Sequence, residues 1–190
     1  GVNRFNQPNV QESKSITNEM IYAYKDNPVL EEGDVLFSND SYAIFANGNE
    51  NLKGKPLEEI LSTIISPKKG DYIGINAFLP RNNINFEALQ QLRRKIMQKY
   101  SIPVTLGFGP RFLHSTGQLH KGGKNNGIFL ILTQDPSIDI PIPNEGMKFS
   151  TLERAQALGD KLALEQNGRR VLRMHFNTQT FLESDTSSFF

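Results

Sequence analysis

The sequence contains no cysteine among its 190 residues. Without thiols the chain can form neither a disulfide nor a thiolate metal site. It also lacks the run of roughly 18 to 20 apolar residues that a membrane-spanning helix requires. The opening residues, GVNRFNQPNV, have no basic region followed by an apolar run, as a secretory signal would. We therefore expect a cytoplasmic protein that does not associate with a membrane.

The chain also lacks an excess of charge of either sign. Its 21 basic and 20 acidic residues leave a formal net charge of +1. This balance gives no extended field that would attract nucleic acid or an anionic membrane, so neither is expected as a partner. With 37% hydrophobic and 22% charged residues, the chain is in the globular range and long enough for one core.

The first third of the chain predicts two helices on either side of a hairpin. Residues 6–24 are expected to be helical, because Pro8 suits the first position and apolar residues recur at helical spacing. Residues 34–47 favour two short strands around a turn. Residues 55–66 predict the second helix, with Pro56 near its start and a stripe of leucine and isoleucine.

From Tyr72 onward, apolar strands alternate with amphipathic helices, which is typical of an α/β fold. The apolar runs suit a mainly parallel sheet flanked by helices on both faces. For the last helix, Ser150 and Glu153 predict a capping box, and Asn167 with Gly168 predicts the end. The expected order is strand 72–79, helix 85–100, strand 104–108, a histidine-containing loop, strand 127–133, helix 151–166 and strand 169–176.

The loop FLHSTGQLHKGG, residues 112–123, is the part of this region richest in chemically active side chains. His114 and His120 are six positions apart, so one helix face would not present both to a metal, and no cysteine completes a ligand set. Ser115 is not in the strand–GxSxG–helix context of an esterase nucleophile. Metal binding and serine nucleophilic catalysis are therefore disfavoured.

Two interpretations of the loop remain open. In the first, backbone amides freed by glycine turn toward an anion, and nearby lysines add positive charge. In the second, the glycines only form turns and His114 is a hydrogen-bonded core residue. The residues that would form the anion cradle are Gly107, Gly109, Gly122, Gly123, Lys121 and Lys124.

Two segments resemble glucose-6-phosphate isomerases. FNQPNVQESK is similar to the family signature F-D-Q-x-x-V-E/Q-x-x-K, with Asn6 where the family usually has aspartate. GFGPRFLHSTGQLHKGG, together with RAQALGD, resembles the C-terminal part of the isomerase half in bacterial transaldolase/phosphoglucose isomerase fusions. The resemblance implies that Gln7 contacts the substrate phosphate and that Lys14 takes part in opening the sugar ring.

The histidine-containing loop also resembles the family stretch H-S-x-x-Q-L, which a second histidine and a glycine follow. The resemblance implies that His114 assists ring opening, although a structural role for it stays open. In the ordinary isomerase this motif precedes the lysine motif, whereas here Lys14 comes first. The resemblance further suggests a set of substrate-binding residues in the loop, namely Ser115, Gln118, Lys121, Gly122 and Gly123.

Isomerisation of glucose 6-phosphate to fructose 6-phosphate, a step of glycolysis and gluconeogenesis, needs a phosphate site, an acid–base pair and a carboxylate base. In the family, the phosphate loop and the glutamate base precede the lysine signature, and nothing of that kind precedes Phe5. We therefore expect a C-terminal isomerase segment that is inactive alone, uses no cofactor and binds a sugar phosphate and upstream isomerase domains. A homodimer is one possible assembly. The alternative is a non-catalytic module for sugar-phosphate binding or assembly.

The sequence pattern and the resemblance together suggest how the chain is organised. Residues 1–27 would be the helix that ends an upstream isomerase domain, and residues 28–71 a hairpin-and-helix accessory region. Residues 72–176 would form the α/β domain, followed by a polar tail at residues 177–190.

Overall fold

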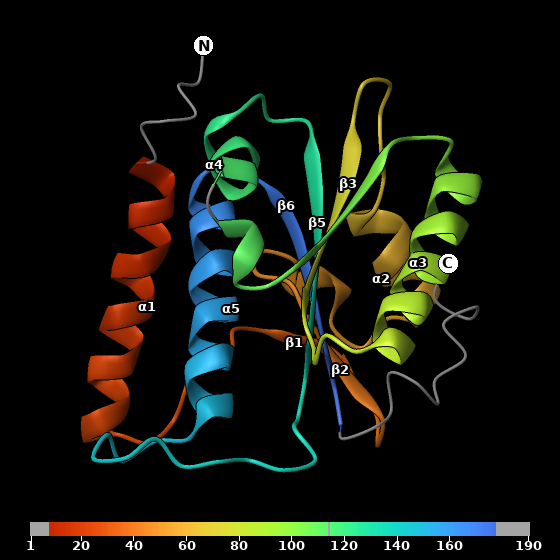
Figure 1. The fold of residues 1–190 in the computed structure, drawn as a ribbon. Coiled ribbons are helices and arrows are strands. Elements are labelled where there is room, and N and C mark those ends of the chain that lie inside the picture. The colour runs from red at the N-terminus through yellow and green to blue at the C-terminus, as the bar shows by residue number, and fades with distance from the viewer. Residues whose placement is uncertain (1–7, 114, 178–190) are drawn as a thin grey trace.

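The computed structural model describes residues 8–113 and 115–177, and its centre is a six-stranded sheet in the order β1-β2-β6-β5-β3-β4 (Figure 1). Strands β3 to β6 are parallel to one another, while β1 and β2 form an antiparallel hairpin that joins the sheet through β6. The strands are β1 (Val35–Ser38), β2 (Tyr42–Phe45), β3 (Tyr72–Phe78), β4 (Val104–Phe108), β5 (Gly127–Gln134) and β6 (Arg170–Phe176).

Helices cover both faces of this sheet (Figure 1). Helices α2 and α3 lie on one face, α4 and α5 lie on the other, and α1 packs outside α5 as a further layer. The helices are α1 (Pro8–Asp26), α2 (Leu57–Ile64), α3 (Asn83–Tyr100), α4 (Ser115–Gly122) and α5 (Phe149–Gln166), with short 3-10 turns η1 (Glu50–Leu52) and η2 (Arg111–Leu113). The predicted α/β class, with a mainly parallel sheet between helices, is confirmed.

The position of β5 between two layers of helices explains why its sequence is apolar throughout. Leu130 belongs to the core beneath α2 and α3, whereas Phe129 and Ile131 belong to the core beneath α5. Successive side chains of a strand point to opposite faces, so a strand covered on both sides needs apolar residues at every position. The predicted hairpin is also present, and it extends the same sheet rather than standing apart.

Helix α1 approaches α5 closely through small residues. Ser13 and Thr17 are buried on the α5 side of α1, and the Thr17 hydroxyl donates a hydrogen bond to the Ser13 carbonyl oxygen at 2.8 Å. Gly159 of α5 lies opposite them, and a Cβ at this position would overlap the Thr17 Oγ1 atom. The residues predicted to end an upstream domain are therefore packed directly on the α/β layer.

The start of α5 differs from the predicted capping box. The helix begins at Phe149, and Lys148 occupies the N-cap position without a capping side chain. Ser150 instead donates from its backbone N–H and its hydroxyl to the two carboxylate oxygens of Asp139, at 3.2 and 2.5 Å. The capping-box prediction is wrong because an acceptor from the preceding loop satisfies this end of the helix. The predicted end is confirmed, with Gly168 at a φ of +68° just after the helix.

The segment predicted as a histidine-containing loop is largely helical. It contains most of η2 and the whole of α4. His114 lies outside the described residues, as do Gln7 and the tail from residue 178 onward. None of the helices within residues 8–113 and 115–177 combines the length and the apolar character of a membrane span.

Candidate functional site

A cavity of about 540 Å³ lies between α1, α5 and the turn that follows β4. We call it the lysine–arginine cavity, because Lys14 of α1 and Arg111 of η2 both line it. These residues come from the two segments that carry the resemblance described above. Its lining residues are Ser13, Lys14, Thr17, Asn18, Ile21, Pro110, Arg111, Leu152 and Gln156.

The charge of this cavity is positive. The side chains of Lys14 and Arg111 are exposed and form no ion pair or hydrogen bond within residues 8–113 and 115–177. No aspartate or glutamate is among the described residues that line it. Two cations without a nearby carboxylate favour an anionic ligand, and Asn18 and Gln156 add amide groups that can bind hydroxyls.

Gln118 holds α4 against the start of α1. Its Oε1 atom accepts a hydrogen bond from the Asn9 backbone N–H at 3.0 Å, and its Nε2 atom donates to Asn9 Oδ1 at 2.7 Å. Gly122 lies at the same contact, where a Cβ would come within 2.5 Å of Asn9 Oδ1. The backbone carbonyl of Gly123 accepts from Arg169 Nη2 at 2.7 Å. In this structure these three residues join elements together and do not line the lysine–arginine cavity.

Lys121 points into the interior. Its ammonium lies 2.5 Å from Asp160 Oδ1, and both side chains are only 1% exposed. Burial raises the pKa of Asp160, and the nearby Lys121 opposes that rise. Asn76 of β3 donates to the other carboxylate oxygen of Asp160 at 3.4 Å. Because its charge is already paired and covered, we leave Lys121 out of the proposed site. Ser115 is described only as the first residue of α4.

His120 is a core residue. Its ring lies 4.8 Å from the ring of Phe129, between centroids, and the rings of Tyr72 and Phe112 are also nearby. Burial lowers the pKa of His120 to about 4, with further lowering by Lys121 and Arg169. The imidazole is therefore neutral at pH 7, and its position favours packing over proton transfer.

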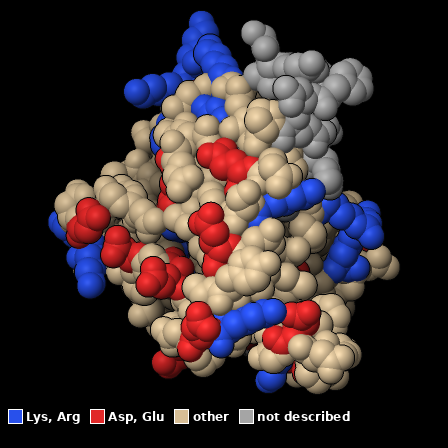
Figure 2. Space-filling model, turned by 90° about the vertical axis from the view of Figure 1, so that its left-hand side faces the viewer, with Lys and Arg blue, Asp and Glu red and all other residues tan. Residues whose placement is uncertain are grey.

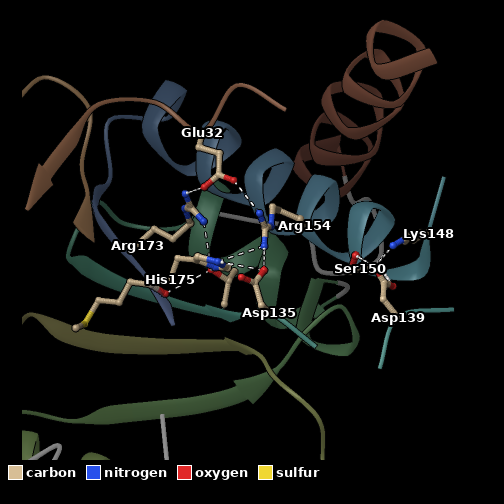
Figure 3. Close-up of polar contacts among 10 residues, drawn as sticks. Glu32, Asp135, Asp139, Lys148, Ser150, Arg154, Arg173 and His175 are labelled. Atoms are coloured by element: carbon tan, nitrogen blue, oxygen red, sulfur yellow. Dashed lines mark hydrogen bonds and ion pairs between the residues drawn. The ribbon is translucent and has the colours of Figure 1, made fainter. Parts of the chain in front are cut away.

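A second polar group of residues, which sequence reasoning did not identify, lies at the carboxyl ends of β5 and β6 (Figure 3). We call Glu32, Asp135, Arg154, Arg173 and His175 the charge cluster. Glu32, from the segment between α1 and β1, accepts from Arg154 at 3.1 Å and from Arg173 at 2.5 Å. Burial acts to raise the pKa of Glu32, but the two arginines outweigh it and hold the pKa below its usual value. Glu32 thereby ties its segment to α5 and the sheet.

His175 completes this network. Its Nδ1 atom lies 3.0 Å from Thr133 Oγ1, and its Nε2 atom lies 3.2 Å from Arg154 Nη2. The same Nε2 atom lies 3.4 Å from Asp135 Oδ1, so it faces both a donor and an acceptor. Burial, followed by the charge of Arg154, lowers the pKa of His175. Most donors and acceptors of the cluster are thus paired within it, which is typical of a structural network, whereas the buried Nε atom of Arg173 has no hydrogen-bond partner among the described residues.

The sequence did contain a signal for this cluster. Arg173 and His175 alternate with Leu172, Met174 and Phe176, and alternation by two places both polar residues on one face of β6. Beside this cluster lie the carboxyl ends of β3 and β5, where the chain leaves β3 toward α3 and leaves β5 toward α5 on the opposite face (Figure 1). Ligands of other parallel sheets bind at such a point. The cavity at that point measures only about 10 Å³, which is room for about one water molecule.

No protein-family model and no curated protein matches this chain. Among solved structures, it is similar to the crystal structure of a hypothetical protein from Thermus thermophilus, with a TM-score of 0.46 and 18% sequence identity. The match covers 65% of this chain and 33% of that chain, so the matched region spans about a third of the other protein. The function proposed below therefore rests on the residues of the site, on their arrangement and on the resemblance in the sequence.

Proposed function

We propose that the chain is the C-terminal segment of a glucose-6-phosphate isomerase, in which the lysine–arginine cavity receives the sugar phosphate. The observation that carries this proposal is the position of Lys14 and Arg111 on the walls of one cavity, although they are far apart in the sequence. A volume of about 540 Å³ is within the range of small-ligand sites. The resemblance alone did not require these two segments to meet.

The two cations take different parts in this proposal. The guanidinium of Arg111 can bind a phosphate with two parallel hydrogen bonds, which fixes both its position and its orientation. The ammonium of Lys14 is a single charge on a flexible stem, and the resemblance implies that it moves a proton during ring opening. Asn18 and Gln156 would then bind sugar hydroxyls between them.

The base of the isomerisation has to come from elsewhere. Moving a proton between C1 and C2 needs a carboxylate near both carbons. Among the described residues, the cavity has no aspartate or glutamate on its walls. We therefore propose that upstream isomerase domains supply this carboxylate and that the chain alone binds the sugar phosphate without turning it over.

One observation favours the alternative, a non-catalytic module that binds a sugar phosphate. Gln118 and Lys121, two of the residues suggested for the substrate, are buried and hold the fold together. A cavity that keeps its cations but has no acid–base pair would bind such a ligand without chemistry. The two functions differ in what Lys14 does in the parent protein.

A coupled dehydrogenase assay tests the proposal. The isolated chain should give no turnover of glucose 6-phosphate or fructose 6-phosphate above background. In the parent protein, Lys14→Ala should lower kcat on the cyclic sugar far more than on an open-chain analogue, because only the cyclic sugar requires ring opening. Lys69→Ala, which removes an exposed lysine remote from the cavity, is the matched control and should change neither.

Three outcomes would contradict parts of this account. Turnover by the rigorously purified chain would place the carboxylate within these residues. If Lys14→Ala lowered kcat equally on the cyclic and open-chain substrates, Lys14 would have no part in ring opening. Unchanged kinetics on both would leave the non-catalytic module as the better function.

A further inference from the structure

A second cavity, of about 530 Å³, lies on the opposite flank of α1. Thr17 of α1 is packed on Gly159 of α5, and this contact separates the two flanks. Lys14 and Asn18 line the lysine–arginine cavity on one side, whereas Met20 and Ala23 line the second cavity on the other. The remaining walls of the second cavity come from α5 and from the segment between α1 and β1.

The walls of this second cavity are largely apolar. Met20, Leu30, Leu158 and Leu162 contribute aliphatic side chains from three separate parts of the chain. Its volume is in the range of sites that bury a small organic molecule. The cavity therefore offers a hydrophobic surface to a ligand with an aliphatic portion.

Only some of the charged side chains that line the second cavity are available to bind a ligand. Glu32 is held by Arg154 and Arg173, and Lys161, at 1% exposure, is paired with Glu165 at 3.0 Å. These two groups are neutralised by their partners. Glu19 and Glu31 have no such partner within residues 8–113 and 115–177. The available charge at the cavity is therefore negative, and we call it the acidic cavity.

Acidic side chains also lie elsewhere on the surface around α1 (Figure 2). Figure 2 shows the face of the molecule on which α1 lies, and acidic side chains gather over the middle of that face, with basic ones mainly toward its margins. The lysine–arginine cavity has the opposite charge, so the two flanks of α1 select different ligands.

We propose that the acidic cavity binds an aliphatic ammonium compound. The ammonium group lies between Glu19 and Glu31, and the hydrocarbon stem lies against Met20, Leu158 and Leu162. A carboxylate on the same stem would face two like charges, and a neutral alcohol would lack the ionic contact. This site is separate from the sugar-phosphate site and does not depend on it.

Calorimetry with hexylammonium, hexanoate and hexanol tests the charge preference on the intact chain. Hexylammonium should bind with a dissociation constant in the millimolar range or tighter, and hexanoate should show no binding. The double variant Glu19→Gln/Glu31→Gln should weaken hexylammonium binding by about tenfold, as expected for two partly solvated ionic contacts. The matched control is Glu87→Gln, an exposed acidic residue of α3 on the other side of the sheet, and it should bind as the unmodified chain does.

A second variant tests the location. Ala23→Trp places an indole at the cavity wall, at an exposed position where the change should leave the melting temperature nearly unchanged. This variant should no longer bind hexylammonium. In NMR spectra of the unmodified chain, adding hexylammonium should shift the backbone amide resonances most strongly around Met20, Ala23 and Leu162. Binding of hexanoate as strong as that of hexylammonium, or hexylammonium binding that survives both sets of substitutions, would overturn the proposal.

Discussion

Lys121 and Asp160 form an ion pair 2.5 Å long in the interior, between α4 and α5, with each side chain only 1% exposed. The sequence suggested Lys121 as a ligand-binding lysine, whereas in the structure its ammonium is paired with a carboxylate of the same chain. A buried pair of this kind costs desolvation of both groups, and removing one partner leaves the other uncompensated.

Asp160→Asn should therefore destabilise the chain by about 3 to 5 kcal/mol, measured by urea unfolding. The double variant Lys121→Met/Asp160→Leu should recover much of the loss, because it removes both buried charges. The exposed pair between Lys25 and Glu145 provides a control, and Lys25→Met should have little effect on unfolding. If the double variant were no more stable than Asp160→Asn, the loss of stability would not come from leaving one buried charge without its partner.

The contact between Gly159 and Thr17 predicts a coupled effect. Gly159→Ala adds a Cβ that overlaps Thr17 Oγ1, so unfolding should become easier by about 1 to 3 kcal/mol despite the better helix propensity of alanine. Thr17→Ala removes that oxygen, and the two changes together should cost less than their sum. Strict additivity in thermal or urea unfolding would mean that α1 does not pack on α5 at this point.

The two buried histidines should make stability depend on pH. The pKa of His120 is lowered from 6.5 to about 4, and burial also lowers that of His175. Below about pH 6.5 these two histidines bind more protons in the unfolded chain than in the folded chain, so their contribution to stability falls as the pH is lowered toward about 4. For His120 alone the difference approaches about 3 kcal/mol.

Urea unfolding across this pH range measures the effect. His120→Phe, which keeps a ring among the aromatic neighbours, should flatten the dependence while leaving the remaining slope from His175. An unchanged slope in this variant would indicate that His120 is not buried in a neutral form.

The sequence predicted the layers of the fold better than it predicted the contacts between them. The apolar run of β5 and the helical spacing of α1 and α5 are local patterns, and the structure bears them out. The capping box failed because Asp139 reaches Ser150 from a loop, an interaction that local sequence does not determine. The loop at residues 112–123 was predicted from its glycines and histidines, yet Gln118 and Lys121 find partners in α1 and α5 that make it a packed helix.

Part of the candidate site could likewise be predicted from the sequence. Lys14 was suggested by the resemblance, but its position in the same cavity as Arg111 depends on how α1 packs on α5, which no spacing in the sequence gives. The charge cluster had a local signal in the alternation of Arg173 and His175 along β6. Its partner Glu32 comes from a segment without a recognisable pattern, so the whole network could be identified only from the structure.

The central claim is that the lysine–arginine cavity holds a sugar phosphate, and calorimetry with fructose 6-phosphate tests it most directly. The account predicts binding of fructose 6-phosphate and none of neutral fructose at the same concentrations. Lys14→Met and Arg111→Met should each weaken binding by about tenfold or more, as expected for a charge-assisted contact, and Arg94→Met on the far side of the sheet should not. Undiminished binding in both cavity variants, or equal binding of fructose and fructose 6-phosphate, would contradict it.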